Sequence, residues 1–151
     1  SQKKANSKLS KIISINSALK LLDIKTRMVP SINLWNELLE KFNLAVGKLE
    51  YIDDTPENPQ INYSRNYIKG VYELEKLMDL CDLNLANIST PTLILQAKND
   101  PVVNPKSGKL IFNKINTPNK KLVEIDANKH VIITGEKKEI VFQEIIDFIL
   151  K

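Results

Sequence analysis

The strongest constraint on the fold is residues 92–105, Thr-Leu-Ile-Leu-Gln-Ala-Lys-Asn-Asp-Pro-Val-Val-Asn-Pro. The apolar run that opens this stretch is typical of a strand buried on both faces of a sheet. Pro101 holds the two residues before it away from helical geometry, so we expect the strand to end in a turn at Asp100. Asn104 and Pro105 then supply a cap and a first-turn proline for a helix. An acidic residue just past a buried strand occupies the position at which α/β sheets place their functional groups.

From residue 88 onward the sequence alternates between strand-like and helix-like segments. The expected strands are residues 92–96 and 121–125, and each leads through a loop into a helix, the last helix running from about 136 to 150. His130, the only histidine, lies in the second of these loops. Alternation of this kind predicts a parallel sheet with right-handed crossovers.

Two strands are too few to form a stable sheet of this type, so we expect the end of an α/β fold without its beginning. Residues 92–96 should then lack a neighbour on one side. An unpaired, apolar strand edge invites pairing with another chain, so the sequence predicts self-association of this piece, by edge pairing or by exchange of the helices in residues 1–65.

The first half of the sequence indicates helices. Residues 8–28 show mostly helical spacing of apolar side chains, and Ser31 is a candidate cap for a second helix. Residues 51–64 contain two prolines and many turn formers, which favours a loop and a domain boundary, and a third helix is expected from about 67 to 84. The second helix carries one broad apolar stripe: Leu34, Trp35, Leu38, Leu39 and Phe42.

Composition excludes several classes of protein. A length of 151 residues with 42% apolar and 26% charged residues is that of a globular protein, and no apolar run approaches the roughly 20 residues of a membrane span. The net charge of +4 is concentrated in residues 1–50, with nine Lys/Arg against four Asp/Glu, but no nucleic-acid reading motif accompanies it. A polar N-terminus without a signal-peptide pattern, together with the single cysteine Cys81, predicts a cytoplasmic protein.

No cofactor or metal site is expected. One histidine and one cysteine, 49 residues apart, do not make a zinc site, and the four glycines are isolated, so they cannot form a phosphate loop. The acidic loop with Asp53, Asp54 and Glu57 lacks the dense oxygen ligands and turn glycine of a calcium site. Cys81 falls on the apolar side of a helix, where it acts as a small hydrophobic residue.

The pair Asp100 and His130 carries the expected chemistry. A carboxylate that accepts a hydrogen bond from one imidazole nitrogen fixes the tautomer, and the other nitrogen can then take a proton from a serine hydroxyl. The order Asp then His, at the ends of consecutive strands, is that of α/β-hydrolases. The alternative is that Asp100 only begins a turn and His130 is a structural histidine. The G-x-S-x-G nucleophile turn is absent from the chain, and Ser64, Ser89 and Ser107 are not on a strand-to-helix elbow.

A set of short segments distributed over residues 72–148 supports the catalytic interpretation of Asp100 and His130. These segments are Glu73-Leu74, Leu77-Met78, 85–88 (Leu-Ala-Asn-Ile), 91–97, 100–107, Lys120-Lys121, 130–132 (His-Val-Ile) and 145–149 (Ile-Ile-Asp-Phe-Ile). In this order they resemble the C-terminal end of α/β-hydrolase-fold carboxylesterases, monoacylglycerol lipases and lysophospholipases.

The resemblance implies that Asp100 is the acid and His130 the base of a Ser-His-Asp triad. It also implies that residues 1–65 form a helical cap and residues 66–151 the C-terminal core portion of the hydrolase. The first six strands of the family's sheet, its oxyanion-hole loop and its nucleophile are then missing from this chain, so the partners would be an N-terminal half and a small-molecule or lipid ester. Alone, the chain should not hydrolyse esters.

Five apolar residues are the candidates for substrate binding. They are Val102, Val103 and Val131, which follow the two expected triad residues, and Trp35 and Leu38 of the helical segment. For Trp35 and Leu38 the alternative is ordinary packing of the helix on a core. Arg65 and Lys69 would suit an anionic head group or be a solvated pair. For the whole chain, the alternative function is a non-catalytic assembly or ligand-binding module derived from an α/β-hydrolase.

Overall fold

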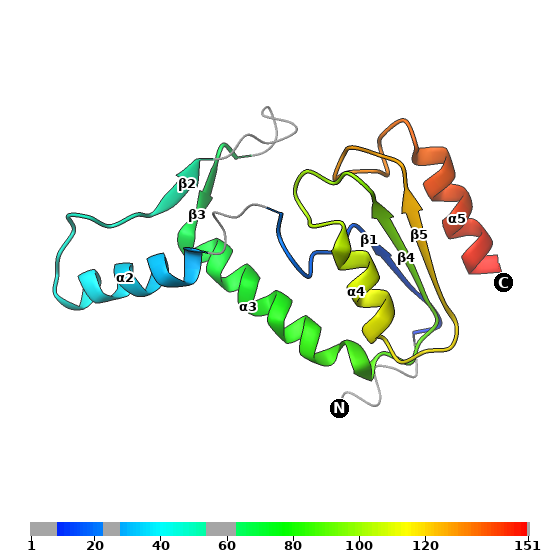
Figure 1. Cartoon of the computed structure of the whole chain (residues 1–151), viewed down its shortest axis with the longest axis horizontal. Helices are drawn as coiled ribbons and strands as arrows, with labels where there is room; N and C mark the ends of the chain where they lie inside the picture. The colour runs from blue at the N-terminus through cyan, green and yellow to red at the C-terminus, as the bar shows by residue number, and fades with distance from the viewer. Residues whose placement is uncertain (1–8, 23–27, 54–62, 151) are drawn as a thin grey trace. The chain divides into compact units, whose positions relative to one another are not determined.

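The computed structural model describes residues 9–22, 28–53 and 63–150, and these form two compact units (Figure 1). The sheet unit comprises the described parts of residues 1–22 and 80–151. The helical unit comprises the described parts of residues 23–79. The expected boundary at residue 65 differs from this division, in which the described residues 9–22 belong with the sheet.

The sheet unit is built on three parallel strands in the order β1-β4-β5. They are β1 (Ile12–Ile15), β4 (Thr92–Ala97) and β5 (Lys120–Ile125). Thr92 at the start of β4 is opposite Ile12 on one side and Lys120 on the other, so the three strands begin level with one another. The predicted parallel sheet of the α/β class is therefore confirmed, with one strand more than expected.

The prediction of a helix across residues 8–28 is wrong where the structure describes it, since Ile12–Ile15 is a strand and residues 8 and 23–27 lie outside the described residues. The sequence Ile-Ile-Ser-Ile is rich in β-branched side chains, which favour strands over helices. The prediction that β4 lacks a second neighbour is also wrong, because β1 fills that position.

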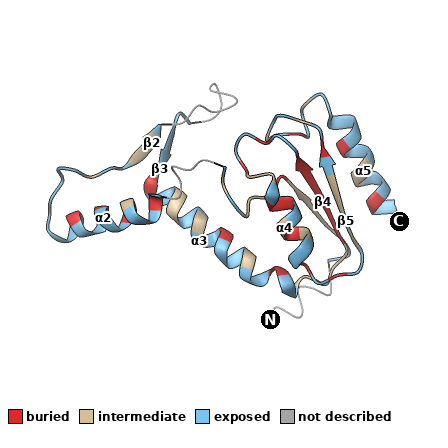
Figure 2. Ribbon diagram, viewed as in Figure 1, coloured by how far each residue is buried: buried red, intermediate tan, exposed pale blue. Residues whose placement is uncertain are grey.

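The central strand β4 is buried along its whole length (Figure 2). Its alternate side chains enter two separate apolar clusters, as the pleat of a strand requires. Leu93, Leu95 and Ala97 pack in a cluster that includes residues of α5 (Lys138–Leu150). Ile94 packs in a second cluster with residues of α4 (Lys106–Lys114) and of the short 3-10 turn η2 (Leu85–Asn87). The two helices therefore cover opposite faces of the sheet.

The helical unit contains α2 (Val29–Lys41), a two-stranded antiparallel ribbon of β2 (Tyr51–Asp53) and β3 (Arg65–Tyr67), and most of α3 (Ile68–Asn84). The third helix was predicted almost to the residue. Strand β2 occupies the start of the stretch expected to be a loop, residues 51–64, and β3 follows directly after it; residues 54–62 lie outside the described residues.

Two polar residues of helix α2 are buried, whereas several of its apolar residues are exposed. It begins at Val29, with Pro30 in the first turn, so the expected cap at Ser31 is instead a residue within the helix. Asn33 and Asn36 are buried, and Asn36 exchanges two hydrogen bonds with the backbone of Leu49, donating at 2.6 Å and accepting at 3.0 Å. The predicted apolar stripe is exposed except for one member: Leu34, Trp35, Leu38 and Phe42 are exposed, and only Leu39 is buried.

Among the described residues, no helix combines the length and the hydropathy that crossing a membrane requires.

Candidate functional site

The structure brings Asp100 and His130 together at the carboxyl ends of β4 and β5. The two strands continue to pair just beyond their last residues, because Lys98 donates its backbone N–H to Ile125 at 2.9 Å and Asn99 donates to Ala127 at 3.1 Å. These two bonds hold the loop that carries Asp100 beside the loop that carries His130. The edge of a parallel sheet at the carboxyl ends of its strands is where α/β proteins bind ligands.

The carboxylate of Asp100 is completely buried and has partners for both oxygens. Oδ1 accepts the backbone N–H groups of Val102 and Val103, both at 2.8 Å. Oδ2 lies 2.8 Å from Nδ1 of His130. Since a buried carboxylate is stable only when it is hydrogen-bonded or paired, these contacts explain how an acidic residue is accommodated here. They also fix the direction in which Oδ2 points.

The imidazole of His130 is about one-third exposed, at 34%. A neutral imidazole that faces a carboxylate with Nδ1 carries its proton on that nitrogen and its lone pair on Nε2. The ring is thus held in the tautomer that a general base needs. A bond to a carboxylate also stabilises the positively charged ring that forms when Nε2 accepts a proton.

Asn16, which directly follows β1, also belongs to this site and was not among the predicted residues. It is buried and has a left-handed backbone conformation, with φ of 44°. Its side-chain amide accepts the backbone N–H of Ala97 at 2.7 Å and donates to the backbone carbonyl of His130. The available sequence signal was an Asn-Ser pair after a short β-branched run, since asparagine tolerates this conformation better than most residues.

The predicted substrate-binding residues differ in exposure and belong to different units. Val102 and Val131 are exposed beside the two polar residues, at 45% and 47%. Val103 is buried at 2% and forms an isolated bridge with Leu21, so its side chain belongs to the interior and a direct substrate contact is not expected. Trp35 and Leu38 lie on α2 of the helical unit and are exposed; the indole N–H of Trp35 donates to the carbonyl of Gly47 at 3.2 Å.

The remaining sequence candidates have structural roles or lie outside the described residues. Ser107 is buried in the first turn of α4, where its hydroxyl accepts the backbone N–H of Lys20 at 3.2 Å. Arg65 forms an ion pair with Asp53 at 3.5 Å and lies over the ring of Tyr51. Cys81 is exposed rather than packed on an apolar face. Asp54 and Glu57 are outside the described residues, and in the described part of the chain no three His, Cys, Asp or Glu side chains gather as a metal site requires.

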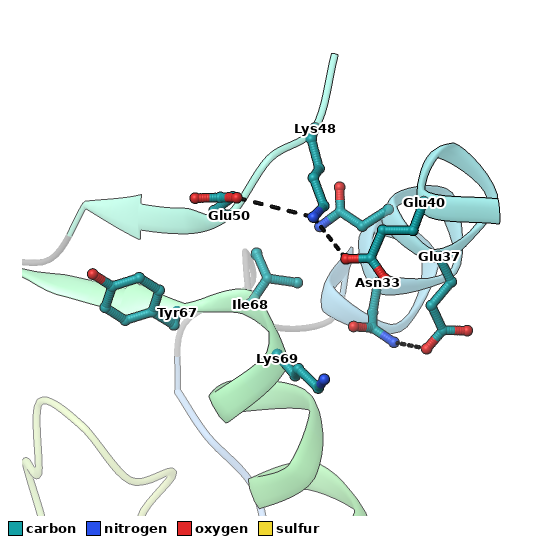
Figure 3. Close-up of a pocket in the computed structure, with 9 residues that line it drawn as sticks. Asn33, Glu37, Glu40, Lys48, Glu50, Tyr67, Ile68 and Lys69 are labelled. Carbon is teal, nitrogen blue, oxygen red and sulfur yellow. Dashed lines mark hydrogen bonds and ion pairs between the residues drawn. The ribbon is translucent and has the colours of Figure 1, made fainter. Parts of the chain in front are cut away.

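Each unit contains a cavity of about 290 Å³ that is lined by described residues. The cavity of the sheet unit lies beside the loop before and after His130, between residues 126–129 and 135–137. Most of the residues that line the cavity of the helical unit are polar or charged (Figure 3), and Lys48 lies 2.6 Å from Glu40 and 4.0 Å from Glu50. The hydrogen bond and charge of Lys48 lower the pKa of Glu40. Three of the charged side chains that line this cavity, Glu40, Lys48 and Glu50, thus pair with one another.

Comparison with known proteins places the chain among hydrolases. A family model described as serine aminopeptidase, S33 matches residues 4–138. A carboxylesterase of Bacillus subtilis (strain 168) is 31% identical over an alignment of 113 residues, and the match covers 60% of this chain and 46% of that protein. The chain therefore spans about half the length of this curated relative.

Solved structures show the same partial coverage. One reported for the metagenome-derived lipolytic enzymes LipS and LipT matches with a TM-score of 0.74 at 19% identity, over 97% of this chain and 57% of that one. A monoacylglycerol lipase of Paleococcus ferrophilus matches with a TM-score of 0.69 at 16% identity, over 97% and 60%. At this level of identity the likeness concerns the fold.

Proposed function

Because the chain belongs to the serine aminopeptidase S33 family and has an α/β-hydrolase fold, we propose that it is the C-terminal portion of a serine hydrolase that cleaves carboxylic esters. In this proposal Asp100 is the acid and His130 the base of the triad. The observation that carries it is the 2.8 Å contact between Nδ1 of His130 and the buried carboxylate of Asp100 at the carboxyl ends of neighbouring parallel strands.

The proposed reaction begins with proton transfer to His130. Nε2 takes the proton of a serine hydroxyl while the serine oxygen attacks the ester carbonyl, and Asp100 stabilises the imidazolium that forms. His130 then returns the proton to the departing alcohol, and water hydrolyses the acyl-enzyme with His130 again acting as base. The nucleophile and the oxyanion donors come from outside residues 1–151, since the chain has no G-x-S-x-G turn.

An ester is favoured over a peptide as the substrate class because the named relatives include a carboxylesterase and lipolytic enzymes. Exposed Val102 and Val131 flank the polar pair and would contact the ester. The exposed apolar side of α2, with Trp35 and Leu38, would act in a cap that receives the acyl chain. A lysophospholipase-type substrate falls within the proposed class. The cytoplasmic location stays a prediction from the sequence.

The test is covalent labelling of the full-length protein, meaning the proposed hydrolase of which residues 1–151 are the C-terminal portion. The label is a fluorophosphonate probe, which reacts with an activated serine nucleophile. We expect the wild-type protein to be labelled and the His130→Ala protein not to be labelled, since the serine then has no base. Lys129→Ala is the matched control, because Lys129 is the exposed neighbour of His130 on the same loop, and it should label normally.

Two results would reject the proposal. Equal labelling of the wild-type and His130→Ala proteins would show that His130 does not activate the nucleophile. Absence of labelling in the wild-type protein would favour the non-catalytic module instead.

A further inference from the structure

A single buried asparagine connects all three strands of the sheet unit at the site. Asn16 is the first residue after β1, and its side chain reaches the end of β4 and the loop that follows β5. Only 4% of its surface is exposed. A buried amide in a left-handed backbone conformation is costly unless it is satisfied, and here both ends of the amide have backbone partners.

The side-chain amide of Asn16 takes the place of the next backbone hydrogen bond between β1 and β4. The backbone N–H of Asn16 still donates to Leu95 at 2.9 Å, in register with the strand. The next donor on β4 is the N–H of Ala97, and it bonds to the side-chain oxygen of Asn16. The chain can therefore leave the sheet at Asn16 without leaving a buried N–H unpaired.

The side-chain nitrogen of Asn16 forms a hydrogen bond with the backbone of His130. This nitrogen donates to the backbone carbonyl of His130, the residue whose ring faces Asp100. The backbone of His130 is thus anchored to Ala97, three residues before Asp100, through one rigid amide group. Between the same two loops, the backbone N–H groups of Lys98 and Asn99 also donate to Ile125 and Ala127, which lie closer to the strands than His130 does.

We propose that Asn16 is a positioning residue that keeps the imidazole of His130 within hydrogen-bonding reach of Asp100. The inference rests on the proposed function, because it assigns to Asn16 a role in orienting the general base. Aspartate at this position would still accept from Ala97 and tolerate the left-handed conformation, but it has no N–H for the His130 carbonyl and would repel it. Glycine would keep the conformation and lose both bonds.

The test uses the full 151-residue chain with ¹⁵N-labelled histidine. His130 is the only histidine, so both ring nitrogens are assigned without ambiguity. At alkaline pH the ¹⁵N shifts of a neutral imidazole report which ring nitrogen carries the proton. The wild-type chain should show the Nδ1–H tautomer as the dominant form. In Asn16→Asp this tautomer should become the minor form, as in Asp100→Asn, which removes the carboxylate.

Asn43→Asp is the matched control. Asn43 is also a non-glycine residue with positive φ, 55°, but it is exposed and belongs to the helical unit. Its variant should keep the wild-type ring shifts. Backbone amide spectra of every variant report whether the fold is intact.

The outcomes separate the two proposals. Unchanged ring shifts in Asp100→Asn would contradict the proposed acid–base pair itself. Changed shifts in Asp100→Asn with unchanged shifts in folded Asn16→Asp would reject the positioning role alone. If Asn16→Asp unfolds, Asn16→Gly takes its place, since it introduces no charge. Unfolding of both variants would assign Asn16 to fold stability and overturn the positioning role.

Discussion

The proximity of Asp100 and His130 was predictable because local sequence signals place each of them after a strand. A proline after Asp100 indicated a turn at the end of a buried strand, and His130 followed the next strand-like run, so parallel pairing brought both to one edge. Asn16 was not predictable in this way. Its partners are 81 and 114 residues away, and its role depends on a left-handed backbone that many asparagines never adopt.

A carboxylate on α3 offers a test of electrostatics at the residue scale. Burial, and then the charge of Asp79 one helical turn away, raise the pKa of Glu75. The folded protein therefore binds this proton more tightly than the unfolded chain, and the stabilisation that the protonated form provides is lost as the pH rises through the raised pKa. At neutral pH the ionised side chain destabilises the fold.

Glu75→Gln should therefore increase the free energy of unfolding at pH 7, by about 0.2–0.5 kcal/mol, since Glu75 is only partly buried and solvent screens its repulsion from Asp79. This difference in the free energy of unfolding should vanish in acid, where the side chain at position 75 is neutral in both the wild-type and the variant protein. Urea denaturation at the two pH values measures it. Glu73→Gln is the control, because Glu73 forms an ion pair with Lys76 at 3.0 Å and its loss should not stabilise the fold. A loss of stability in Glu75→Gln at pH 7 would contradict this account.

At the scale of elements, two lysines tie the strands to the helices that cover them. Lys11, just before β1, donates to the carbonyls of Phe148 and Ile149 at the end of α5, at 2.8 and 2.7 Å. Lys120, the first residue of β5, donates to the carbonyls of Phe112 and Ile115 at the end of α4, at 2.8 and 2.9 Å. Each ammonium satisfies carbonyls that a helix leaves unpaired at its C-terminus.

Elements of ordinary length were predictable, and short ones were not. The buried run of β4 and the long α3 gave clear periodic patterns. The four residues of β1 are too few to show a period, and their spacing from Leu9 imitated a helix. The apolar stripe of α2 was visible in the sequence, but nothing local indicated that Asn33 and Asn36 would take the buried side of this helix instead.

The packing of α4 on β4 gives a second prediction. A Cβ at Gly108 would lie 2.8 Å from Cβ and 3.1 Å from Cγ of Gln96, so Gly108→Ala forces the helix away from the strand. We expect a loss of about 1–3 kcal/mol in the free energy of unfolding. Gly70→Ala in α3 is the matched control. A Cβ there meets nothing within 4 Å, so the higher helix propensity of alanine should stabilise the protein by up to about 1 kcal/mol.

Denaturant melts of the two variants provide the measurement. Equal effects of the two alanine substitutions would show that Gly108 is not required for close packing on Gln96.

At the scale of the whole molecule, the pairing of β1 with β4 makes β1, rather than β4, an edge strand of the sheet. In the described part of the chain β1 and β5 each pair only with β4, so they are the edges of the three-stranded sheet. Ile12 and Asn16 direct their N–H groups to β4, and the alternation along a strand therefore directs those of Ile13 and Ile15 outward. The predicted self-association stays a prediction, with the β1 edge replacing the β4 edge as its site.

The central claim is that Asp100 and His130 form the acid–base pair of a serine ester hydrolase. The most direct measurement is kcat/KM of the full-length protein on a short-chain ester, with Asp100→Asn compared with Asp126→Asn. An amide at residue 100 can hold His130 in the wrong tautomer, so we expect a loss of about 10⁴-fold, the size known for this change in triad enzymes. Asp126 is exposed on the loop after β5, and its variant should retain nearly wild-type activity. Activity of Asp100→Asn within tenfold of the wild-type protein, or no hydrolysis by the wild-type protein, would contradict the claim.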